Sequence, residues 1–143
     1  MNIARRDGGQ SLVEIALMLP IFAFTLIGGA DLARAYALQL AVQNGARAGA
    51  ESYAIDASPT DAEAALVVFN EMNRTPGMDA SLAVITVTKK QSDGVTSCLT
   101  PPTILAPCFV TVRVQYTFRT SASWPLIPNT ANFDRTTTVR TFY

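Results

Sequence analysis

The feature that most constrains this chain is an apolar run over residues 11–30, in which Glu14 is the only charged residue. As an α-helix, at about 1.5 Å per residue, the run extends roughly 30 Å, the thickness of the hydrocarbon core of a bilayer. Two arginines shortly before the run favour a cytoplasmic N-terminus and export of the rest of the chain. We therefore predict a transmembrane helix over residues 10–30 and an exported domain over residues 31–143.

A secretory signal peptide is the main alternative for this run, because small residues near Ala35 and Ala37 offer cleavage sites. The run is long for a signal peptide, however, and it contains an acid. An alanine-rich helical pattern also continues beyond it with little to break the helix. A twin-arginine signal would need flanking residues that the two arginines lack. A retained membrane anchor is the favoured interpretation.

An acid inside a membrane-spanning segment is costly and usually marks a function. Glu14 lies about one turn into the helix, where it can reach water and where the helix dipole favours a carboxylate. If a peptidase cut the chain after Gly9, Gln10 would instead carry a new α-amino group. Glu14 could then pair with that amine on a neighbouring subunit of a fibre. On these residues alone, Glu14 is either an interfacial acid or an assembly charge.

Pro20 lies in the middle of the apolar run and removes one backbone hydrogen bond, to the carbonyl of Ala16. Membrane helices tolerate such a proline. Pro20 is therefore either a kink that helps a subunit leave the bilayer or fit a curved fibre, or an ordinary proline of a membrane helix.

Residues 8–50 resemble the TadE-like minor pseudopilins of tight-adherence (Tad, or Flp) pilus systems. Their sequence is GGQSLVEIALMLPIFAFTLIGGADLARAYALQLAVQNGARAGA. A glycine followed five residues later by glutamate is similar to the class III signal of type IV pilins. The other shared positions are Leu19, Pro20, Gly28, Gly29 and Asp31. Ile15 comes after the glutamate where major Tad pilins commonly have tyrosine, and the C-terminal domain is larger than theirs. Both departures favour a minor pseudopilin.

The resemblance implies that a prepilin peptidase removes residues 1–9 as a cytoplasmic leader, cutting between Gly9 and Gln10. The mature chain would be a single-pass protein of the bacterial inner membrane with a periplasmic domain, able to enter an extracellular pilus. Its implied partners are the peptidase, other Tad pilins and pseudopilins, the inner-membrane platform and membrane lipid. The implied function is pilus assembly, adhesion and biofilm formation. The alternative is a single-pass membrane protein with a periplasmic binding domain unrelated to pili.

The exported part predicts a pilin-like α+β fold, in which the long N-terminal helix continues to about residue 55. A second, short helix and a small antiparallel sheet of about three strands come after it. One face of the continued helix carries Ala35, Leu38, Val42, Ala46, Gly49 and Tyr53. Its small residues allow close approach of either the domain's own sheet or a neighbouring pilin helix.

The second helix is predicted to start with Ser58 as N-cap and Pro59 in the first turn. Its inward side is predicted to carry Ala62, Ala65, Leu66, Phe69 and Met72. Strands are predicted over residues 82–88, 109–119 and 135–143. The second strand alternates most clearly, with one face made of Val110, Val112, Val114, Tyr116 and Phe118.

Cys98 and Cys108 fall in the connection between the first two predicted strands. On the predicted topology this connection lies outside the cytoplasm, where disulfides persist. A bridge would add about 3 kcal/mol to stability on the chain-entropy account. Two cysteines in a chain without histidine fall short of the four ligands of a structural zinc site, so we predict a disulfide.

Composition argues against catalysis and against nucleic-acid binding. The 11 basic and 11 acidic residues cancel and are scattered, which is not typical of a nucleic-acid groove. The chain has no histidine, so no Ser-His-Asp or Cys-His arrangement can form. Phosphate-binding glycine motifs are also missing. We expect no enzyme activity, no cofactor, no metal and no small-molecule substrate.

Overall fold

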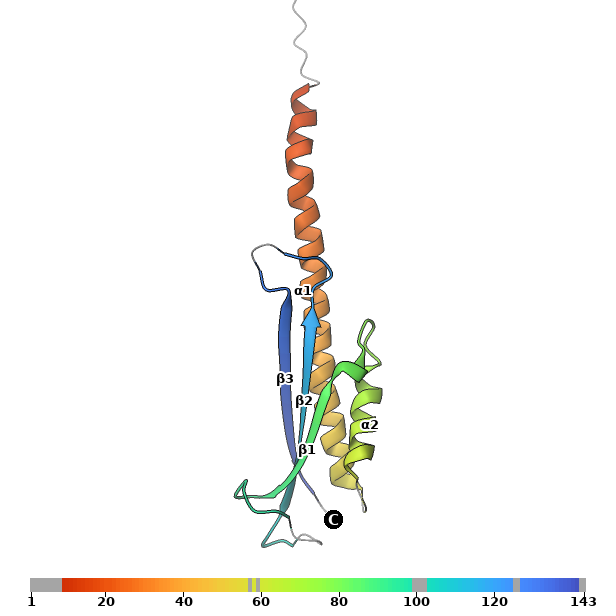
Figure 1. Ribbon diagram of the computed structural model, residues 1–143, viewed down its shortest axis with the longest axis vertical. Coiled ribbons are helices and arrows are strands. Elements are labelled where there is room, and N and C mark those ends of the chain that lie inside the picture. Colours follow the sequence, from red (N-terminus) through yellow and green to blue (C-terminus); the bar gives the residue numbers. More distant parts are fainter. Residues whose placement is uncertain (1–8, 57, 59, 99–102, 125–126, 142–143) are drawn as a thin grey trace, which may run out of the picture. The chain divides into compact units, whose positions relative to one another are not determined.

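The computed structural model describes residues 9–56, 58, 60–98, 103–124 and 127–141 (Figure 1). The elements, in chain order, are the helices α1 (Gln10–Ile55) and α2 (Asp61–Met72), the 3₁₀ turn η2 (Ala80–Leu82), and the strands β1 (Val84–Gln91), β2 (Cys108–Arg119) and β3 (Thr130–Arg140). A long first helix, a second short helix and a three-stranded antiparallel sheet confirm the predicted α+β class. The chain divides into two units, residues 1–34 and 35–143, which are described separately.

The first unit contains the N-terminal part of α1. The helix is unbroken across Pro20. Large apolar side chains on all its faces are exposed: Leu12, Val13, Ile15, Leu17, Met18, Leu19, Ile21, Phe22, Phe24, Leu26, Ile27 and Leu32. A helix that is apolar all round matches the interior of a bilayer or of an assembly. Within the described residues, α1 is the one helix long and apolar enough to cross a membrane.

The second unit is built around β2, which lies between β1 and β3. The register pairs Val84 with Gln115 on one side of β2, and Phe109 with Arg140 on the other. The alternation predicted for β2 is confirmed, because every second side chain is buried: Val110, Val112, Val114, Tyr116 and Phe118. This face of the sheet forms the core of the unit.

The ends of two strands differ from the prediction. β1 begins at Val84 because residues 80–82 form a 3₁₀ turn, in which the Asp79 carboxylate accepts a hydrogen bond from the Ser81 amide at 3.1 Å. β3 begins at Thr130, five residues before the predicted start. Phe133 explains the earlier start, since its ring lies 6.0 Å from that of Phe118 on β2. The aromatic contact extends the pairing beyond the threonine-rich segment.

The second half of α1 supplies the helical side of the core. Its buried apolar side chains are Leu38, Ala41, Val42, Ala46, Ala50, Tyr53 and Ala54, and Gly45 and Gly49 are buried as well. The predicted helix face is therefore confirmed, with Ala35 at its half-buried margin. Alanine dominates this face, so the helix backbone can approach its neighbours closely.

Gly45 and Gly49 are the positions where α2 crosses α1. A Cβ atom at Gly49 would overlap Cγ2 of Val68 and would lie 3.2 Å from the Ala64 carbonyl oxygen. A Cβ atom at Gly45 would lie 2.7 Å from Cγ of Met72. The sequence suggested the sheet or a neighbouring pilin helix as the partner of this face. At the two glycines the main partner is α2, which neither alternative named.

The start of α2 differs from the prediction. Its N-cap is Thr60 rather than Ser58, and Pro59 lies outside the described residues. The Thr60 hydroxyl accepts a hydrogen bond from the Glu63 amide at 3.2 Å, and the Thr60 amide donates to the Glu63 carboxylate at 3.1 Å. This reciprocal capping box satisfies two amides, whereas a serine cap two residues earlier lacks the matching glutamate.

The inward face of α2 was predicted only in part. The buried residues are Ala64, Val68 and Met72, whereas Ala62 and Leu66 are exposed. The contact with Gly45 and Gly49 gives the reason. A narrow ridge of side chains four residues apart fits over the two glycines. For this reason Ala64, Val68 and Met72 face α1, and the bulkier row that contains Leu66 does not.

Candidate functional site

The predicted cleavage site lies at the start of α1. Gly9 is exposed, and a Cβ atom there would meet nothing within 4 Å. Gln10 is the first residue of the helix, and its side-chain amide donates a hydrogen bond to Oε1 of Glu14 at 3.1 Å. None of the described residues therefore covers the peptide bond between Gly9 and Gln10. An α-amino group created at Gln10 would begin the same helical turn that ends at Glu14.

Glu14 is exposed and borders a shallow apolar hollow lined by Ile15, Met18, Leu19 and Phe22. Among the described residues, no lysine or arginine nitrogen lies within 4.0 Å of its carboxylate. The single chain offers this acid a neutral amide, from Gln10, and apolar neighbours. Such a carboxylate needs water, a lipid headgroup or a cation from another chain.

Pro20 lies within α1, and the helix continues on both sides of it. The ring has no N–H to donate to the Ala16 carbonyl. The kink predicted at this proline stays a prediction. The apolar side chains flanking it, Leu19 and Ile21, are both exposed.

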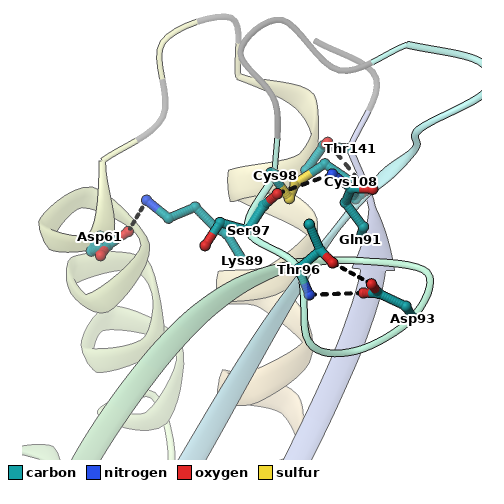
Figure 2. Close-up of a disulfide and its surroundings, with 9 residues drawn as sticks. All are labelled: Asp61, Lys89, Gln91, Asp93, Thr96, Ser97, Cys98, Cys108 and Thr141. Atoms are coloured by element: carbon teal, nitrogen blue, oxygen red, sulfur yellow. Dashed lines mark hydrogen bonds and ion pairs between the residues drawn. A yellow bond between two sulfur atoms is a disulfide. The ribbon is translucent and has the colours of Figure 1, made fainter.

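At the end of the sheet, Cys98 and Cys108 are joined in a disulfide, with their Cα atoms 5.3 Å apart (Figure 2). The sequence placed both cysteines in the connection between strands, but Cys108 is the first residue of β2 and pairs with Gln91. Its carbonyl accepts a hydrogen bond from the Thr141 amide at 2.9 Å. The bridge therefore fastens the chain that returns from β1 to the start of the central strand.

The turn before Cys98 is organised by Asp93. One carboxylate oxygen accepts hydrogen bonds from the amides of Val95, at 3.0 Å, and Thr96, at 2.9 Å. The other oxygen accepts a short hydrogen bond from the Thr96 hydroxyl (Figure 2). These bonds lower the pKa of Asp93, with the Thr96 hydroxyl as the largest cause. Gly94 has a φ of +72°, a conformation that glycine adopts without strain.

A contact between three elements was not predicted. Lys89 on β1 lies with its Nζ 3.2 Å from the Asp61 carboxylate on α2 and 5.4 Å from the centre of the Tyr53 ring on α1. A hydrogen bond with the Tyr53 side chain is the largest cause of the raised pKa of Lys89, and Asp61 is the second. Only the fold brings these three residues together, so no local sequence pattern could have revealed them.

The outer face of the sheet is polar. Arg113 donates two hydrogen bonds to Asp134 from Nε, at 2.9 and 3.1 Å, and one short bond from Nη2. Gln115 donates to the same carboxylate at 3.2 Å. Arg113 is the main cause of the lowered pKa of Asp134. Because these groups are exposed and satisfied by one another, they form a cross-strand pair of the sheet and no reactive cluster.

Within the part of the chain that the structure describes, no three His, Cys, Asp or Glu side chains are grouped so that they could hold a metal ion. The candidate site residues therefore fall into two sets. Gly9, Gln10, Glu14 and Pro20 belong to the first unit, and the two cysteines belong to the second.

The family described as TadE-like protein matches residues 9–51. The matched segment covers the residues on which the resemblance was based, and it confirms that resemblance. Comparison with curated proteins and with solved structures gave no match. The family indicates a role related to the Tad pilus. The set Gly9, Gln10, Glu14 and Pro20 lies inside the match, and the disulfide lies outside it. Over residues 9–51, the chain is similar to the TadE-like family.

Proposed function

We propose that this chain is a minor pseudopilin of a Tad (Flp) type IV pilus assembly system. It supports pilus assembly and, through the pilus, adhesion and biofilm formation. The observation that carries the proposal is the first part of α1, which lies within the TadE-like match. This part exposes apolar side chains on all its faces, with one acid near its start. A helix of this kind suits both a bilayer and the helical core of a fibre.

In this proposal the chain has a defined topology and is processed once. Residues 1–9 are a cytoplasmic leader that a prepilin peptidase removes. Residues 10–30 span the inner membrane, and residues 31–143 form the periplasmic domain. The exposed, unobstructed Gly9 supports cleavage at this point, because an extended chain must enter the peptidase before the bond to Gln10 is cut.

Glu14 then has different partners before and after assembly. In the membrane-bound monomer Glu14 stays near the membrane interface, where its carboxylate accepts hydrogen bonds from water and from the Gln10 side chain. In the assembly its carboxylate pairs with the α-amino group of Gln10 on another subunit. Such a pair neutralises two charges where an unpaired charge is strongly unfavourable. The partners of the chain are accordingly other pilins and pseudopilins, the platform proteins and the peptidase.

The test of this function is a chromosomal deletion in the host, followed by complementation. The deletion should abolish surface pili and attachment, as counted by electron microscopy and by an adhesion assay. The wild-type gene should restore both. A matched gene encoding Thr86→Ser, a change at an exposed residue of β1, should also restore both. Normal piliation after the deletion would contradict the proposal.

A further inference from the structure

The two edges of the sheet are not alike. Beside β1, the returning chain pairs Ser97 with Lys90, and the Gln91 amide donates to the Thr96 carbonyl at 2.8 Å. The Lys89 side chain reaches Asp61 on α2 (Figure 2). The outer edge of β1 is therefore partly occupied. In the described part of the chain, β3 pairs with β2 alone.

Two hydrogen bonds show which peptide groups of β3 point away from β2. The Thr141 amide donates to the Cys108 carbonyl at 2.9 Å, and the Thr120 amide donates to the Asn129 carbonyl at 3.0 Å. In an antiparallel ladder, residues alternate between bonding the partner strand and pointing away from it. The odd-numbered residues of β3 therefore bond β2. The even-numbered residues direct their N–H and C=O groups to the open edge: Thr130, Asn132, Asp134, Thr136, Thr138 and Arg140. Of these groups, the Asp134 carbonyl accepts a hydrogen bond from the Arg135 guanidinium at 3.1 Å.

The protecting features of β3 are its three charged residues, Asp134, Arg135 and Arg140. Natural edge strands are protected by charged side chains, above all lysine, and by proline, bulges or short length. β3 spans Thr130–Arg140 without proline or lysine, and its register with β2 is continuous. The partly covered strand β1, by contrast, carries two adjacent lysines, Lys89 and Lys90. A long, regular edge strand with two arginines and one acid is a template for a strand of opposite charge.

The open edge is also positively charged. Arg135 and Arg140 lie on β3, and within the described residues neither has a carboxylate within 4.0 Å. The one acid of the strand, Asp134, already bonds Arg113. A strand that pairs with this edge therefore gains from acidic side chains opposite the two arginines.

We infer that the open edge of β3 binds an extended, acidic strand of another protein chain, which adds a fourth strand to the sheet. This rests on the proposed function, in which that chain is another pilus subunit. A second copy of this strand fits poorly, because it would bring its own Arg135 and Arg140 to an edge that already carries these two positive charges.

The test places a photo-crosslinking benzoylphenylalanine at Thr136 or at Thr138 of the full chain in its host. A matched control places it at Thr86 on the outer face of β1. Mass spectrometry should identify crosslinks from the two β3 positions to one segment of another pilus subunit, stepping two residues along it. That segment should carry Asp or Glu. Crosslinks to a second copy, or none above the Thr86 control, would overturn the inference.

Two sets of variants separate main-chain pairing from side-chain effects. Thr136→Pro removes only an N–H that faces the open edge, and it should abolish the crosslink from position 138, whereas Thr136→Ala should keep it. Arg135→Glu with Arg140→Glu should lower the crosslink at least about tenfold, whereas Arg119→Glu on β2 should not. Unchanged crosslinking by Thr136→Pro and by the double glutamate variant would overturn the inference. If the deletion strain lacks pili but these variants crosslink as the wild type does, the inference about the β3 edge is wrong and the proposed function is unaffected.

Discussion

The two halves of α1 share one continuous helix but meet different surroundings. In the first unit the helix exposes apolar side chains on every face, and a Cβ atom at Gly29 would touch nothing. In the second unit the helix buries one face, and a Cβ atom at Gly49 would overlap Val68. The same residue type thus has open space around it in one half and is tightly packed in the other. A helix therefore acquires its role from the surface that covers it.

This comparison separates the effects of substitutions. Changes in the first unit should alter processing and assembly while the domain remains as stable as wild type. Changes in the second unit should alter the stability of the domain while processing remains normal. Four predictions test this separation, from the largest expected effect to the smallest.

The largest effect is expected for Gly9→Leu. A bulky side chain before the scissile bond should block entry into the peptidase, so the full-length precursor should accumulate in the membrane. Intact-mass measurement of the purified protein reads this directly, with Gly9→Ala as the matched small substitution. A normally shortened Gly9→Leu protein would contradict cleavage between Gly9 and Gln10.

Glu14→Gln should leave cleavage and membrane abundance near normal but sharply reduce incorporation into the pilus machinery. Removing one member of a buried ion pair typically costs about 3–5 kcal/mol, because the other charge is stranded. The measurement is co-purification of the processed variant with pilus components. Equal recovery of variant and wild type would make Glu14 an interfacial acid and nothing more.

The disulfide tests the second unit. Replacing Cys98 and Cys108 together by serine should lower the stability of the domain by about 3 kcal/mol on the chain-entropy account. Thermal unfolding measures the loss, and processing after Gly9 should remain complete. Thiol labelling of the unreduced wild-type protein provides the control. Full labelling of both cysteines there would show that the bridge does not form in the cell.

The smallest effect, and the sharpest comparison, is expected from alanine at the glycines of α1. Gly49→Ala should destabilise the domain by about 1–3 kcal/mol, because the new methyl overlaps Val68 and approaches the Ala64 carbonyl. Gly45→Ala should cost less, because its closest contact is with the unbranched side chain of Met72, at 2.7 Å, and its contact with Val68 is longer, at 3.2 Å. Gly29→Ala should leave the unfolding temperature of the domain unchanged. An equal loss of stability for Gly29→Ala and Gly49→Ala would contradict the difference in packing between the two halves of α1.

Much of the architecture could be predicted from local patterns. The apolar run, the alternation of β2 and the TadE-like resemblance were each readable because their evidence lies in consecutive residues. The boundaries of β1 and β3 were less accurate. They depend on the cap that Asp79 forms and on the contact of Phe133 with Phe118, and the second of these joins residues on different strands.

The sequence by itself determined the helix length, the position of its one acid, the strand periodicity and the presence of two cysteines. Only the tertiary structure decided that α2 covers Gly45 and Gly49, that Lys89 joins Tyr53 and Asp61, and that β3 pairs with β2 alone among the described strands. The reason is physical. Periodicity records which side of an element is apolar, whereas the choice of partner depends on shape and distance between elements far apart in the chain.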